Sequence, residues 1–321
     1  MGSPYQTRGR AAATKLHELV VRAARSAPVH LAIITLTPMS ERRQRSDAKL
    51  MDIEVTYHRA NVRAGLLASL SAVAAIVLAS PALAADPKPD AVVKNRNIEA
   101  RVFLDDKIKA DAPLAADCLA EGKKWLDKNA ADAAASRKED PQFFRDGGWD
   151  FERKYSIRSV VADRYVSVLR NDYMDTHGAH PNSDVNTILW DKSESKRISI
   201  RPFFTETADN GATMKAMVKA VIASLRTEKK KRDTSETATN EWFKGVEPSL
   251  LKIGAATLAP STEPGKSSGL TFHYPPYAVG PYAEGQYVAF VPWETLKPYL
   301  TPEGARIFGG ARPKGDADEQ Q

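Results

Sequence analysis

The first candidate for a metal or catalytic site is the segment His177-Gly178-Ala179-His180-Pro181-Asn182, which contains two histidines. Only three histidines follow residue 85, and two of them, His177 and His180, lie here. A zinc site needs three or four ligands, so this pair would need help from nearby acids. Asp172, Asp175 and Asp184 are close in sequence, but no spacing places them on one site. We predict no metal and no cofactor.

The same segment also has an ordinary structural interpretation, which we favour. A nucleophilic enzyme would need a partner for the histidines, and the chain has no Gly-x-Ser-x-Gly elbow. Gly178 can supply a positive φ and Pro181 can fix the exit of a loop, while the histidines bond to its backbone. His177 and His180 are therefore predicted to shape a loop beside a binding surface.

The second group is the loop around 272–285, which contains three tyrosines, three prolines and two glycines. Such a loop is stiff and loses little entropy on binding, and each tyrosine offers an amphipathic ring with a hydrogen-bonding tip. This composition suits recognition of proteins or sugars. Alternatively, the loop is a structural crossover whose tyrosines pack on a sheet. We predict that Tyr274, Tyr277 and Tyr282 form the contact surface.

Paired carboxylates of a glycoside hydrolase are the rival chemistry. Asp172, Asp175 and Glu284 are candidates, together with His180, but their spacing does not single them out. Glycine-rich phosphate-binding motifs are absent from the sequence, which argues against a nucleotide-dependent enzyme. We predict a protein that is not an enzyme.

Strands and helices that must position these groups can be predicted from the periodicity. A helix is expected to begin at Asp111 and Pro113 and to end near Lys138, and a second one carries Met214, Met217 and Leu225 on one face. β-branched and aromatic enrichment predicts strands at 98–104, 149–157, 164–173, 185–190, 197–200, 255–258, 269–273 and 287–291. Short links between several of these strands favour an antiparallel meander.

An export signal is indicated between Arg63 and Asp86. Its apolar heart, Leu66 to Leu78, has the length of a secretory core and is too short to span a bilayer. Small residues at Ala82 and Ala84 predict cleavage after Ala84. We expect residues 1–50 to be an extension ahead of the natural start, at Met39 or Met51, and 51–84 to be the signal peptide. An uncleaved leader would instead make a membrane-tethered sensor.

The charge balance of the remaining chain excludes a nucleic-acid-binding footprint. The whole chain carries 46 Lys+Arg and 40 Asp+Glu, but residues 86–321 carry 35 of each. The one dense basic run, Lys229 to Arg232, is interpreted as the end of a helix. The single cysteine, Cys118, is predicted to be a buried, inert thiol on the apolar face of its helix.

The order of the motifs resembles a known family. Gly-Ala-His-Pro-Asn leads through Ile198-Ser199-Ile200 to Phe203-Phe204, and the tyrosine–proline loop is followed by Val291-Pro292-Trp293-Glu294. This order is similar to the extracytoplasmic domain of RsiV-like anti-sigma factors, which is also attached to some peptidoglycan deacetylases. The resemblance covers roughly 98–308. It implies an α+β fold and, in the anti-sigma members, binding of lysozyme outside the cell that triggers regulated proteolysis.

Together these observations predict an α+β protein with a mixed or antiparallel sheet, helices packed on one side and two intimately packed subdomains. The expected parts are a flexible lead-in (85–97), an N-terminal part (98–200), a C-terminal part (201–308) and a disordered tail (309–321). We expect a periplasmic or secreted binding module with lysozyme, another envelope protein or peptidoglycan fragments as its partner. A peptidoglycan hydrolase is the alternative.

Overall fold

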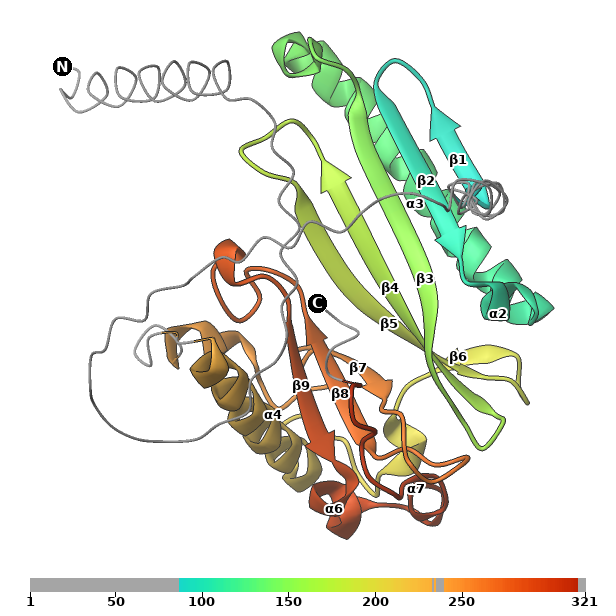
Figure 1. The fold of residues 1–321 in the computed structure, drawn as a ribbon, viewed down its shortest axis with the longest axis vertical. Helices are drawn as coiled ribbons and strands as arrows, with labels where there is room; N and C mark the ends of the chain where they lie inside the picture. Colours follow the sequence, from blue (N-terminus) through green and yellow to red (C-terminus); the bar gives the residue numbers. More distant parts are fainter. Residues whose placement is uncertain (1–86, 233, 235–239, 317–321) are drawn as a thin grey trace, which may run out of the picture. The chain divides into compact units, whose positions relative to one another are not determined.

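The computed structural model describes residues 87–232, 234 and 240–316. The predicted extension at 1–50 and signal peptide at 51–84 lie outside the described residues. Figure 1 shows an α+β fold built on two sheets. A six-stranded sheet has the order β1-β2-β3-β4-β5-β6, and a three-stranded sheet has the order β7-β8-β9. The predicted fold class is confirmed.

The first sheet is mixed because one helix connects two of its strands. Helix α3 (Ala112–Glu139) joins β2 (Ile98–Leu104) to β3 (Trp149–Val161), which pair in parallel, as such a crossover requires. All other pairs in this sheet are antiparallel, so the expected meander forms only part of it. The remaining elements of this half are β1 (Ala91–Lys94), α2 (Asp106–Lys109), η1 (Pro141–Phe144), β4 (Tyr165–Asp175), β5 (Asn182–Asp191) and β6 (Lys196–Ile198).

Helix α3 begins and packs as its sequence predicts. The Asp111 side chain accepts a hydrogen bond from the backbone N–H of Leu114 and so caps the first turn. Leu114, Cys118 and Leu126 are buried against the sheet. Gly122 lets the helix approach closely, since a Cβ there would lie 2.9 Å from Val102 Cγ1. This helix covers one face of the six-stranded sheet.

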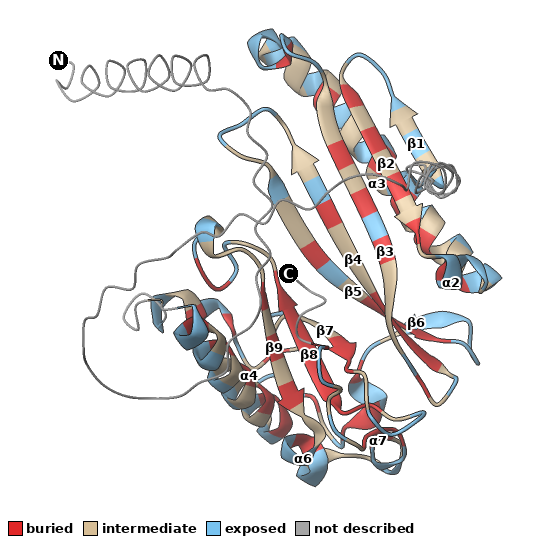
Figure 2. Cartoon of the chain, viewed as in Figure 1, coloured by how far each residue is buried: buried red, intermediate tan, exposed pale blue. Residues whose placement is uncertain are grey.

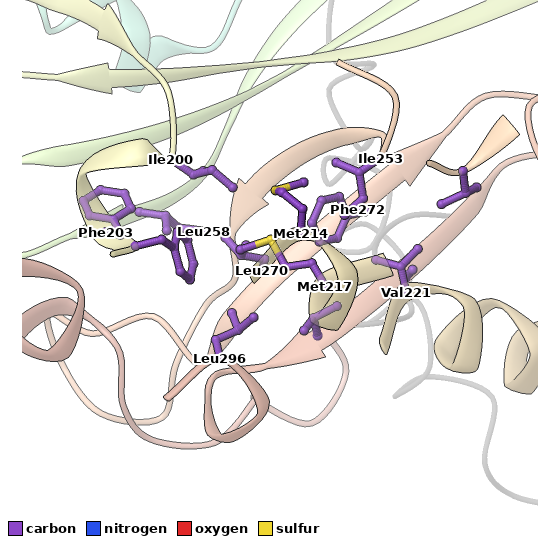
Figure 3. Close-up of a cluster of buried hydrophobic side chains, with 14 of the residues drawn as sticks. Ile200, Phe203, Met214, Met217, Val221, Ile253, Leu258, Leu270, Phe272 and Leu296 are labelled. Carbon is purple, nitrogen blue, oxygen red and sulfur yellow. The ribbon is translucent and has the colours of Figure 1, made fainter. Parts of the chain in front are cut away.

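The second half packs helix α4 (Ala212–Lys231) against the three-stranded sheet. Met214, Met217 and Leu225 are fully buried, as the spacing predicts, and Figure 3 shows Met214 and Met217 beside Phe272 of β8. The elements of this half are η2 (Arg201–Phe203), α4, η3 (Phe243–Gly245), β7 (Ala255–Leu258), β8 (Gly269–Tyr274), η4 (Tyr282–Glu284), β9 (Tyr287–Pro292), α6 (Trp293–Leu296), η5 (Lys297–Tyr299) and α7 (Pro302–Ile307).

The two sheets are joined by hydrogen bonds along β7. Ser159 Oγ of β3 donates to the Leu258 carbonyl over 2.6 Å, and the Leu258 N–H donates to Ser167 Oγ of β4 over 3.0 Å. Every residue of β8 is buried, because both faces of this central strand are covered by protein, including the face toward α4 (Figure 2). The halves therefore form one packed unit.

Two predicted flexible segments are ordered where the structure describes them. The lead-in at 85–97 contains β1, whose residues pair with 99–102 of β2. Ala91 and Val93 of this strand pack against the hydrophobic core between the six-stranded sheet and α3. The predicted tail at 309–321 is packed as far as Asp316, which is buried and forms ion pairs with Arg158 of β3 and Arg312. Both segments therefore make specific contacts within the described residues.

Candidate functional site

Three of the predicted site residues come together from two distant loops. His180 follows β4 in the loop 176–181, whereas Tyr277 and Tyr282 belong to the loop between β8 and β9. The rings of His180 and Tyr282 are stacked, with centroids 3.8 Å apart and planes 19° apart. Tyr277 lies 5.6 Å from Tyr282 and 6.1 Å from His180 between ring centroids. We call these three residues the aromatic cluster.

Hydrogen bonds fix the orientation of His180 within the aromatic cluster. Its Nδ1 lies 2.9 Å from the Pro181 carbonyl oxygen, which can only accept, so Nδ1 carries the hydrogen. In the neutral ring, Nε2 then accepts from the Tyr277 hydroxyl at 3.2 Å. The histidine thereby links the two loops.

Tyr277 is the most prominent member of the aromatic cluster. Its side chain is 51% exposed, although it is a large aromatic residue. Its φ of 70° lies in the left-handed region, which costs a non-glycine residue about 1–2 kcal/mol. Strained backbone of this kind persists where the surroundings hold it, and it is concentrated at functional positions.

The loop that carries the two tyrosines is anchored to the end of α4 through Glu284. The Glu284 carboxylate accepts hydrogen bonds from Lys229 Nζ at 2.6 Å and from the Tyr287 hydroxyl at 2.5 Å. Burial opposes ionisation of Glu284, but these bonds outweigh it and hold its pKa below the ordinary value. Arg232 donates to the Glu284 carbonyl and lies over the Tyr287 ring at 4.0 Å. The aromatic cluster is therefore held on a rigid base.

A cleft of about 720 Å³ opens between the two sheets next to this anchor. We call it the inter-sheet cleft. Strands β3 and β4 supply one side, and the end of β8, the residues after η4 and the start of β9 supply the other. It is lined by Ser156, Leu169, Asn171, Arg232, His273, Glu284, Gly285, Gln286, Tyr287 and Val288. Its size falls in the range of small-molecule sites.

The other two predicted site residues lie elsewhere. Tyr274 is buried, and its hydroxyl donates to the Ile253 carbonyl at 2.5 Å, so its prediction as a contact residue was wrong. β8 is a central strand, and the alternation of its side chains turns Tyr274 into the core. His177 donates from Nε2 to the Gly148 carbonyl at 2.9 Å and is exposed. The backbone φ of His177 is 60°, whereas a positive φ was predicted for Gly178.

The residues proposed for hydrolysis are used in structural contacts. Asp172 is buried and accepts two hydrogen bonds from Arg153, at 2.7 and 2.5 Å. Asp175 accepts from the backbone N–H of His177 and so caps the loop. Glu284 holds the anchor. In the strand register, Asp172 lies opposite Asp184 and Asp175 lies opposite Asp150.

The described part of the chain buries Cys118 and contains no metal-binding group. Cys118 is fully buried, and burial raises the pKa of its thiol to about 12, as an inert thiol requires. Within residues 87–316, leaving out 233 and 235–239, no group of histidines, cysteines and acids is arranged to hold a metal ion. None of the described helices is long and apolar enough to cross a bilayer.

Sequence reasoning missed the residues that build the cleft and its anchor. Lys229 and Arg232 lie at the end of a helix, as predicted, but the sequence did not show that they also bind Glu284, 55 and 52 residues away. No sequence motif includes Asn171, Gln286 or Tyr173. Only the alternation along β4 hints that Asn171 and Tyr173 share a face, and nothing in the sequence says what that face meets.

Part of the chain is similar to a described group of proteins. Residues 203–294 match the family model described as "Protein of unknown function (DUF3298)". No curated protein matches the chain. A solved DUF3298 protein from Pseudomonas aeruginosa PAO1 is 17% identical, with a TM-score of 0.43, over 70% of this chain and 98% of that one. A DUF3298 member from Bacteroides fragilis is 16% identical, with a TM-score of 0.39, over 61% and 72%.

Proposed function

We propose that this chain is a non-enzymatic binding module of the cell envelope that holds a protein ligand on its aromatic cluster. The observation that carries the proposal is the arrangement of His180, Tyr277 and Tyr282, in which the exposed Tyr277 is hydrogen-bonded to a histidine that itself stacks on Tyr282. Tyrosine is enriched among the residues that contribute most to protein–protein affinity. A preorganised surface also loses little conformational entropy when a partner binds.

The resemblance to RsiV-like domains makes lysozyme the first ligand to test, ahead of other envelope proteins. The leader supports a periplasmic or secreted location, because it has the pattern of a cleaved export signal. N-terminal sequencing of the protein from its natural host tests this location. We expect the mature chain to begin at Ala85; an intact leader would instead favour the tethered sensor.

Calorimetric titration with lysozyme tests the ligand. We expect binding by the unaltered protein, and a loss of affinity of about tenfold or more for Tyr277→Ala and for Tyr282→Ala, equivalent to about 1.4 kcal/mol each. Phe143→Ala is the matched control, because Phe143 is 53% exposed but belongs to η1 rather than to the aromatic cluster. Absence of heat at high micromolar protein would exclude lysozyme.

A further inference from the structure

The inter-sheet cleft lies beside the aromatic cluster, and the same elements build both. Helix η4 carries Tyr282 into the cluster and Glu284 into the cleft lining. Strand β4 carries Asn171 in the cleft and, two residues later on the same face, Tyr173. Tyr173 is 40% exposed, and the nearby Tyr282 contributes to raising its pKa after partial desolvation and the charges of Asp175 and Asp150. Tyr173 and Tyr282 therefore lie close in the chain to residues that line the cleft, although neither lines it itself.

Three polar side chains in the cleft have hydrogen-bonding groups that the protein does not use. Ser156, Asn171 and Gln286 are half-buried, and their side chains make no hydrogen bond within the described part of the chain. Half-buried polar groups in folded proteins are normally paired with protein or water. Each amide offers both donors and an acceptor, and the hydroxyl offers one donor and two lone pairs. The cleft can therefore hydrogen-bond a ligand rich in hydroxyl or amide groups.

The cationic groups at the cleft already have partners within the protein, which disfavours an anionic ligand. Lys229, beneath the loop, is buried and bonded to Glu284. Arg232 donates to the Glu284 carbonyl and stacks on Tyr287. A phosphate or carboxylate ligand would have to draw Arg232 away from these two contacts, so the neutral amides and the hydroxyl set the preference.

We propose that the inter-sheet cleft binds an uncharged oligosaccharide, with Ser156, Asn171 and Gln286 hydrogen-bonding its hydroxyl or acetamido groups. The exposed ring of Tyr173, two residues beyond Asn171 on the same face of β4, covers the apolar face of a sugar ring. This inference rests on the proposed function as a binding module, since it uses the surface beside the same aromatic cluster. It names a second ligand class for that surface.

Titration with chitotriose and with maltotriose, followed by NMR, tests the inference, and trialanine serves as a peptide of comparable size. We expect at least one trisaccharide to bind with a Kd below about 10 mM. Asn171→Ala and Gln286→Ala should each weaken that binding about fivefold, as the loss of one hydrogen bond predicts. Asn186→Ala is the matched control, because this exposed β5 amide lies outside the cleft lining and should leave the affinity unchanged.

Three results would overturn the inference: no trisaccharide binds at about 10 mM, trialanine binds more tightly, or both amide variants bind like the unaltered protein. Lysozyme titration of the same variants separates the two proposals. Lysozyme binding without trisaccharide binding removes the oligosaccharide site and leaves the protein-binding function standing. Trisaccharide binding without lysozyme binding keeps the cleft site and rejects lysozyme, and the absence of both rejects both.

Discussion

Protonation of His273 is expected to destabilise the fold as the pH falls. This histidine of β8 is 4% exposed, and its Nε2 lies 2.9 Å from Thr257 Oγ1. Burial, followed by the positive charges of Arg158 and Arg312, lowers its pKa to about 3, against the weaker opposing effect of Asp316. In the unfolded chain the pKa is about 6.5.

The size of the effect follows from these two values. Because the pKa of His273 is depressed in the folded state, the unfolded state binds the proton more readily. The free energy of unfolding is therefore at its full value above pH 6.5 and decreases as the pH falls from there toward 3. A pH of 5 is about 1.5 units below the pKa of the unfolded state, so proton binding stabilises the unfolded state by about 2 kcal/mol. The free energy of unfolding should therefore be about 2 kcal/mol lower at pH 5 than at pH 7.5.

Urea denaturation at the two pH values measures this difference. The unaltered chain and His177→Gln, which changes an exposed loop histidine, should both show the loss, whereas His273→Gln should lack most of it. An equal loss in His273→Gln would refute the reasoning. If that variant fails to fold, NMR of the unaltered protein decides: the imidazole resonances of His273 should not titrate between pH 7.5 and 5.

Three further measurements test the anchor and the core. Glu284→Gln leaves the buried Lys229 ammonium without its carboxylate and should lower the free energy of unfolding by about 3 kcal/mol, with much of it recovered in Lys229→Met/Glu284→Gln; a cost below about 1 kcal/mol in urea denaturation would contradict the anchor. The thiol of Cys118 should not react with a disulfide reagent at pH 8 in the folded protein and should react fully in urea; rapid native labelling would show that it is accessible. Tyr274→Phe should cost about 1–2 kcal/mol in stability, measured in urea, without changing lysozyme affinity; weaker lysozyme binding would restore Tyr274 as a contact residue.

Local pattern was sufficient for most of the secondary structure. The strands predicted at 98–104 and 255–258 have those bounds in the structure, and helix α3 begins at Ala112, directly after its predicted cap Asp111. These features depend on side-chain alternation and on capping, which act over a few residues. Strand β1 escaped prediction because the prolines and charges around it predict a flexible segment, and the strand is stabilised by pairing with β2.

The sequence by itself determined the α+β class, the two amphipathic helices, the buried thiol and the unusual composition of the tyrosine–proline loop. Only the tertiary structure decided which tyrosines are accessible: Tyr274 turns into the core, while Tyr277 meets His180, 97 residues earlier in the chain. It also brought Lys229 to Glu284 and Asn171 to the cleft. Contacts at such separations depend on how the two sheets pack, and no local periodicity encodes that packing.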